Sequence, residues 1–492
     1  MSGPLAAQQE PLSAIDWLSR SVEPNAQTFE PPVSNGATAP QITVTPLDRP
    51  SKDMFGLLPQ SVTGLPRSLW SASDEDMLVA LLQAERVEAL PAIQDFLKVI
   101  ILAEADPPRN ASPSGTLFLA RVDKLLDLGA IEPAQALIEQ ASPDTAPLFR
   151  RWFDVALLTG TENAVCDVMG QKPSIAPTYS ARIFCLARNG DWATAALTLN
   201  THRVLGDVTD AEEMLLTRFL DPEIFEGAPA LAAPARISPL MFRMHEAIGE
   251  GLTTSNLPLA FAHADLRATV GWKPQLEAAE RLARYGAVSE NVLQGFYTAH
   301  TPAASGGVWD RARAVQQFDR AITAQDPADI AATLPAAWAA MRQSRTEVQF
   351  AKLYGPALLQ MPLSDDAQEL AITIGLLSPD YETFARGAAH TSYDPFLIAL
   401  ARGRPQEQVA TSPKARAIQA AFNGSQPPPV LLTLVDQGKL GEALLRAIAL
   451  FNEGFVGDYR LVTDALALMR HVGLEDVARR SALQLMLLER TT

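Results

Sequence analysis

The chain has 492 residues, of which 47% are hydrophobic, enough to fill the cores of about two to four ordinary domains. Its 40 basic and 56 acidic side chains give a net charge of −16, which repels nucleic-acid backbones and anionic membrane surfaces. The most apolar run, residues 96–103, contains Lys98 and is far shorter than the roughly 20 residues that cross a bilayer. We therefore expect a folded protein with no nucleic-acid partner and no transmembrane segment.

The first residues lack the basic start and the apolar centre of a secretory signal. Residues 4–8, PLAAQ, are nevertheless similar to the small-residue end of such a signal, where a signal peptidase cuts. We expect a mature chain whose signal peptide has been removed, and therefore a periplasmic protein. A cytoplasmic protein with a polar start is the alternative.

Residues 11–22, PLSAIDWLSRSV, predict a short amphipathic helix with Pro11 in its first turn. Its apolar stripe consists of Leu12, Ile15, Trp17, Leu18 and Val22. About eleven residues are too few for a helix that is stable alone, so this one must dock on something. The candidates are the chain's own fold, a protein partner and a membrane surface. Because the net charge of the helix is near zero, which does not favour an anionic bilayer, we expect the stripe to dock a protein partner.

Residues 21–64 are rich in Pro, Ser, Thr, Asn and Gln and show no sustained helical period, so we expect an extended N-terminal tail over residues 1–70. From Ser73 onward an N-cap and acidic residues open a helical pattern that continues to the C-terminus. Abundant Ala and Leu with 7% aromatic residues favour an all-α fold. Pro- and Gly-rich breaks divide it into blocks at residues 71–220, 237–402 and 412–492.

A recurring glycine marks the turns between predicted helices. In residues 186–199, LARNGDWATAALTL, Gly190 allows a left-handed turn, and Ala195 lets the second helix approach the first closely. The same pattern, a glycine followed five positions later by a small or apolar residue, occurs at other predicted turns. The whole set of turn glycines is Gly129, Gly160, Gly190, Gly286, Gly438 and Gly473. Gly286 fits the pattern least, because the residue five positions after it is Asn291. The first three lie 31 and 30 residues apart, and the last two lie 35 apart.

Residues 190–195, GDWATA, resemble the G-D-Y-x-E-A pattern of tetratricopeptide repeats, and residues 438–443, GKLGEA, are nearly as close. The resemblance covers about residues 115–205 and 428–492 and lacks most of the family's aromatic positions and closing prolines. It implies an α-solenoid of stacked helical hairpins.

Cys166 and Cys185 are the only cysteines. If the hairpins stack as the resemblance implies, the two residues lie about 5 Å apart along neighbouring antiparallel helices. A disulfide is then geometrically possible and would suit an oxidising compartment; two buried thiols are the alternative.

Motifs that carry chemistry are missing from the sequence. None of the six histidines has zinc-protease spacing, and there is no nucleophile elbow, phosphate loop or dinucleotide fingerprint. His245 with Glu246 and Glu250 is a weak acid–base candidate, and the loop at residues 305–307 before Arg311 and Arg313 is a weak anion candidate. We expect no catalytic residue, no cofactor and no metal.

We therefore expect a non-catalytic helical-repeat scaffold that binds a protein partner. The whole chain, including residues 149–162, FRRWFDVALLTGTE, is similar to uncharacterised envelope proteins of Gram-negative bacteria that carry a cleaved signal, which again implies the periplasm. The alternative is a peptidoglycan-active enzyme or its superhelical accessory protein, because helical superhelices also occur in soluble lytic transglycosylases. The Glu-Ser motif of those enzymes is not visible, and the sequence around Glu347 does not replace it.

Overall fold

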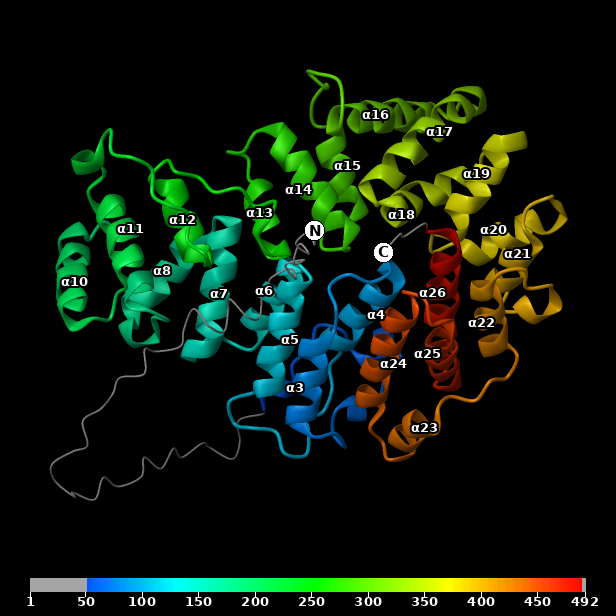
Figure 1. The fold of residues 1–492 in the computed structure, drawn as a ribbon, viewed down its shortest axis with the longest axis horizontal. Helices are drawn as coiled ribbons and strands as arrows, with labels where there is room; N and C mark the ends of the chain where they lie inside the picture. Colours follow the sequence, from blue (N-terminus) through cyan, green and yellow to red (C-terminus); the bar gives the residue numbers. More distant parts are fainter. Residues whose placement is uncertain (1–50, 489–492) are drawn as a thin grey trace, which may run out of the picture. The chain divides into compact units, whose positions relative to one another are not determined.

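The computed structural model describes residues 51–488, and over that range the protein is all-α (Figure 1). The only extended pairing in this range is an isolated bridge between Leu58 and Ala103. The all-α class predicted from the sequence is confirmed. The chain forms two compact units, and each is assembled from segments that are separated in the sequence.

Unit 1 contains residues 51–55, 112–127 and 131–264. Its helices are η1 (Lys52–Met54), α5 (Thr116–Asp127), α6 (Ile131–Gln140), α7 (Ala146–Thr159), α8 (Glu162–Gln171), η3 (Pro173–Ile175), α9 (Tyr179–Arg188), α10 (Trp192–Leu205), α11 (Asp210–Leu220), η4 (Pro222–Phe225), α12 (Pro239–Ala247), η5 (Leu259–Phe261) and most of α13 (Ala262–Asp265).

Unit 2 contains residues 56–111, 128–130 and 265–488 of the described chain. Its N-terminal helices are α2 (Gln60–Thr63), η2 (Arg67–Leu69), α3 (Glu75–Ala84) and α4 (Pro91–Leu102). The remaining helices are α14 (Trp272–Arg284), α15 (Glu290–Thr298), α16 (Val308–Ala324), α17 (Pro327–Ser344), α18 (Glu347–Leu358), α19 (Asp365–Leu376), α20 (Tyr381–Gly387), η6 (Ala388–His390), α21 (Pro395–Ala401), η7 (Pro405–Glu407), α22 (Pro413–Phe422), α23 (Pro429–Asp436), α24 (Leu440–Gly454), α25 (Tyr459–His471) and α26 (Glu475–Leu487).

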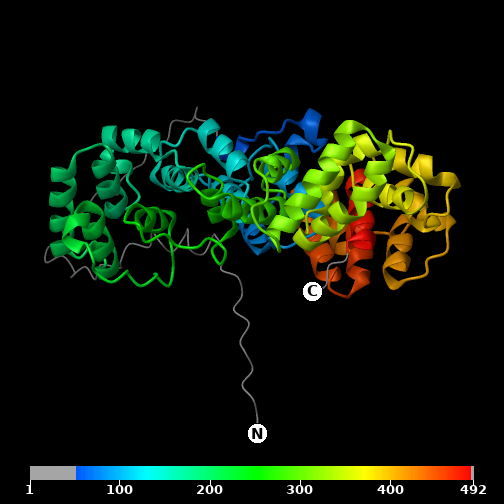
Figure 2. The ribbon, with the colours of Figure 1, turned by 90° about the horizontal axis from the view of Figure 1, so that it is seen from above.

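Helices that follow one another in unit 1 pack side by side: α7 contacts α8, α8 contacts α9, α9 contacts α10, and α11 contacts both α10 and α12. Their shared core contains Phe149, Phe153, Val165, Phe184 and Leu216. In Figure 1, α10 lies at the left-hand edge of this unit, and Figure 2 shows the same residues at the same end from above. Among the described residues of unit 1, the helices that contact α10 are α9 and α11, and several residues on its remaining side are exposed.

The start of unit 2 is folded earlier than the helical pattern of the sequence indicates. Leu69 and Trp70, which precede Ser73, are completely buried. The helices of this N-terminal segment pack on the C-terminal ones, since α3 contacts α24, and α4 contacts α24 and α26. Gly441 of α24 lies so close to Trp70 that a Cβ atom there would come within 2.5 Å of the indole ring. The folded part of the chain thus includes residues 51–70.

Candidate functional site

The hairpin of α9 and α10 is built from the local signals in residues 178–194. The Thr178 hydroxyl accepts a hydrogen bond from the Ala181 N–H at the start of α9, and the Asp191 carboxylate accepts one from the Thr194 N–H at the start of α10. Between them, Gly190 has φ +84°. Its N–H donates to the Ala187 carbonyl and the Asp191 N–H donates to the Leu186 carbonyl, the two bonds of a Schellman turn. The same six residues that resemble a repeat consensus therefore close the hairpin.

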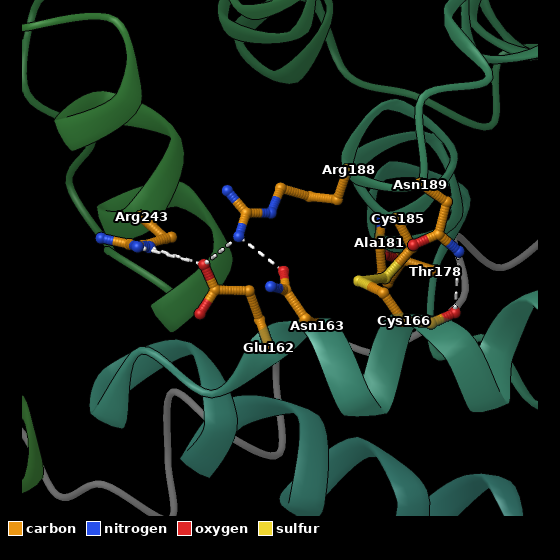
Figure 3. The surroundings of a disulfide bond; sticks show 9 residues. All are labelled: Glu162, Asn163, Cys166, Thr178, Ala181, Cys185, Arg188, Asn189 and Arg243. Atoms are coloured by element: carbon orange, nitrogen blue, oxygen red, sulfur yellow. Dashed lines mark hydrogen bonds and ion pairs between the residues drawn. A yellow bond between two sulfur atoms is a disulfide. The ribbon is translucent and has the colours of Figure 1, made fainter.

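A disulfide joins this hairpin to the preceding helix. Cys166 of α8 and Cys185 of α9 are bonded, with their Cα atoms 4.9 Å apart, and both are buried (Figure 3). The Asn189 side chain donates to the Cys166 carbonyl at 3.4 Å. The crosslink holds α9 against α8 and so fixes the base on which α10 packs.

Ion pairs surround the disulfide. The buried carboxylate of Glu162 lies 3.3 Å from the guanidinium of Arg188 and 3.0 Å from that of Arg243 (Figure 3). Arg188 also donates to the Asn163 side chain at 2.6 Å. These contacts join α8, α9 and α12, so the helices around the disulfide are held by a covalent bond and by charge-assisted hydrogen bonds.

The outward side of α10 carries apolar residues and no charged ones. We call it the α10 face, and it consists of Ala193, Ala196, Leu197, Asn200, Thr201 and Val204, all exposed. Leu197 is 67% and Val204 is 81% exposed, and both lie on the side of the helix opposite the buried Ala195 and Leu199. An exposed helix normally turns charged residues to solvent, so the composition of this face is unusual for a surface helix.

Further exposed apolar side chains occur on α10 and on the elements that follow it. Trp192 is 49% exposed at the start of α10, and its ring lies 6.2 Å from that of Phe219 of α11. Leu205, Met214 and Ile224 are also exposed, on α10, α11 and η4. Exposed apolar side chains are therefore not confined to the α10 face in this part of unit 1.

The larger clusters of charged residues elsewhere connect helices. In unit 2, Asp95 of α4 lies 3.0 Å from Lys98 and 2.7 Å from Lys352 of α18. Burial raises the pKa of Asp95, but the two ammonium groups outweigh it and lower that pKa to about 2. Arg311 of α16 binds both oxygens of Glu280 of α14. These groups neutralise one another in helix seams, as structural ion pairs do.

The charged groups of the two chemical candidates of the sequence have structural partners. His245 itself is buried and its Nδ1 atom has no hydrogen-bond partner; burial lowers its pKa while Glu250 opposes the shift. Glu250 accepts from Arg218 at 2.6 Å and from the Leu231 N–H, and Glu246 pairs with Arg243. At the anion candidate, Arg311 binds Glu280 and Arg313 binds Asp310 at 2.8 Å. Neither constellation presents an unengaged set of groups to a ligand.

A cavity of about 150 Å³ lies among η6, α21 and η7 of unit 2, lined by residues that include Tyr393, Arg402 and Arg404. Its two arginines are exposed, and Arg404 lies 3.7 Å from Glu407. Within residues 51–488 no group of three or more His, Cys, Asp and Glu side chains is placed to hold a metal ion. No helix in that range is long and apolar enough to cross a membrane.

The remaining residues singled out in the sequence fall into two groups. The turn glycines all have positive φ: Gly129 +67°, Gly160 +81°, Gly190 +84°, Gly286 +60°, Gly438 +74° and Gly473 +86°. The apolar stripe of Leu12, Ile15, Trp17, Leu18 and Val22 lies outside the described residues.

Sequence analysis missed the α10 face. The signal is present in residues 192–205, WATAALTLNTHRVL, where apolar residues fall on both sides of the helix and the only full charge is Arg203. A buried helix has the same pattern, so the sequence alone does not distinguish the two environments.

Comparisons with known protein families, with curated proteins and with solved structures gave no match to this chain.

Proposed function

We propose that this protein is a non-catalytic scaffold that binds another protein through the α10 face. The observation that carries the proposal is an uncharged helix face with Leu197 and Val204 in solvent, above a framework fixed by the Cys166–Cys185 disulfide. Exposed apolar side chains on one helix face are typical of protein docking sites, and such a face suits a partner helix laid along it.

The scaffold is proposed to be an α-solenoid of tetratricopeptide-like hairpins. In support, successive helices of unit 1 are neighbours in space, and Gly190, Gly286, Gly438 and Gly473 each close a helix with the same pair of Schellman hydrogen bonds.

We further propose a periplasmic location after removal of a signal peptide, with the cytoplasm as the alternative. The disulfide between Cys166 and Cys185 supports an oxidising compartment, because thiols in the cytosol are kept reduced. The peptidoglycan-active alternative gains no such support. Glu347, the carboxylate considered for it, is 4% exposed at the start of α18, where a glycan strand has little access.

A crosslinking pull-down from the native cell envelope tests the proposed function. The variant Leu197→Gln/Val204→Gln removes the apolar character of the α10 face without adding charge. Val62→Gln/Val430→Gln is the matched control, because both valines are in helices and are 68% and 69% exposed. We expect a specific partner with wild-type and control protein and its loss with the α10 variant. Equal recovery with all three proteins would contradict the proposal, as would peptidoglycan release by the purified wild-type protein.

A further inference from the structure

We propose that residues 11–22 of the chain dock intramolecularly on its own α10 face and compete there with the protein partner. This inference rests on the proposed function, since it names a regulator of the same surface. Three observations support it: the pattern of the segment, the place where the described chain begins, and the charge of the two surfaces.

The segment has the chemistry that the α10 face requires. The spacing of Leu12, Ile15, Leu18 and Val22 places four aliphatic side chains on one side of a helix, whereas Trp17 falls on the other side. The α10 face presents aliphatic side chains at matching helical intervals, with Ala193, Leu197 and Val204 along one line. Two such stripes pack side by side as neighbouring helices do, about 8–10 Å between axes.

The connecting chain is long enough to bring the two together. At the start of the described chain, Lys52 lies 2.6 Å from Asp144 in the loop between α6 and α7. Lys172, directly after α8, donates to the Asp144 carbonyl at 3.0 Å. Since α8 contacts α9 and α9 contacts α10, the axes of α8 and α10 are at most about two helix spacings, or ~20 Å, apart. The 28 residues between Val22 and Ser51 have an average reach of about 30 Å.

Charge also favours this pairing. Residues 11–22 contain one acidic and one basic side chain, Asp16 and Arg20, and so have no net charge. The α10 face has no charged residue, and Arg203 at its border is engaged with Glu213 at 3.2 Å. The segment can therefore dock on the α10 face without burying a charge on either surface. The net charge of the chain is −16, so an acidic segment would in contrast be repelled.

Photo-crosslinking of the full chain tests the contact directly. Leu18 is replaced by benzoylphenylalanine, the protein is irradiated at low concentration, and the crosslinked peptides of the monomer band are mapped. We expect crosslinks to residues 193–205 within one chain. The yield should fall at least about tenfold in the Leu197→Gln/Val204→Gln background and persist in the Val62→Gln/Val430→Gln background. Crosslinks only in a dimer band, only to other helices, or to no site would overturn the inference.

A labelled peptide of residues 9–24 measures the competition. We expect the peptide to bind the full chain carrying Ile15→Gln/Leu18→Gln and to bind the wild-type chain about 20-fold more weakly. The factor of about 20 follows from an effective concentration of about 1 mM for the tethered segment and a Kd of about 50 μM for the free peptide. Equal affinity for the two chains would refute an intramolecular cover. Partner recovery separates the two proposals: it should rise with the Ile15→Gln/Leu18→Gln chain. If crosslinking succeeds but the α10 variant still recovers the partner, the proposed function fails and the intramolecular contact stands.

Discussion

The turn at Gly190 gives a sharp prediction, because the effect of a substitution there on stability depends on backbone conformation alone. Gly190 has φ +84°, is exposed, and has no atom within 4 Å of the position that a Cβ would occupy. Gly295 in α15 is equally open around its Cβ position, but its φ is not positive. The same substitution at the two sites therefore separates the effect of a left-handed backbone from any effect of steric crowding.

Gly190→Ala should destabilise the protein by about 1 kcal/mol, because a left-handed residue with a side chain costs about 1–2 kcal/mol and the reduced freedom of the unfolded chain offsets part of that. Gly190→Val should destabilise it by more than ~1 kcal/mol, since a β-branched residue at positive φ is a strained outlier. Gly190→Asn should be close to wild type because asparagine tolerates this region. Gly295→Ala should instead stabilise by about 0.5–1 kcal/mol, the helix preference of alanine over glycine.

Thermal unfolding followed by far-UV circular dichroism measures all four variants. At about 2–4 °C per kcal/mol for a unit of this size, Gly190→Ala should lower the Tm and Gly295→Ala should raise it by a few degrees each. Shifts of the same sign at the two sites would refute the reasoning. A Gly190→Val variant as stable as wild type would show that this turn does not need a left-handed residue.

Two other groups of unit 1 give predictions of different kinds. Thiol titration of the unfolded, unreduced protein should find no free thiol, and two titratable thiols would exclude the disulfide. The double variant Cys166→Ser/Cys185→Ser should have a free energy of unfolding lower by about 3 kcal/mol, because the disulfide closes a loop of 19 residues. Burial raises the pKa of Asp154 in α7 to about 6, against the opposing charges of Arg150 and Arg151. Between about pH 7 and 4 the folded state therefore binds this proton more tightly than the unfolded state. The free energy of unfolding should rise as the pH falls through that range, by at most ~3 kcal/mol. Urea unfolding across that range should show a smaller rise for Asp154→Asn, and an unchanged pH dependence would contradict the assignment.

The sequence by itself determined the helical class and the turns. Helix caps, Schellman glycines and the Ala- and Leu-rich composition act over a few residues, so they can be identified without knowledge of the fold. Gly190 illustrates this, since its neighbours Leu186 and Asp191 complete the turn with backbone hydrogen bonds. The length of the N-terminal tail could not be determined in this way, because the buried residues Leu69 and Trp70 pack against Gly441 of α24, which lies some 370 residues later in the sequence.

Tertiary structure alone decided the environment of each side chain. Gly438 and Gly441 stand in one sequence motif, yet Gly438 turns the chain at φ +74° and Gly441 lies inside α24 against Trp70. Asp154 and the charged residues of the helix seams are ordinary surface residues in the sequence and become buried only when helices meet. The α10 face shows the opposite case. Leu197 and Val204 belong to a helix with the pattern of a core helix, yet they are exposed because none of the described helices of unit 1 covers them. Local sequence fixes backbone conformation through short-range sterics and hydrogen bonds, whereas burial depends on which helices are neighbours in space.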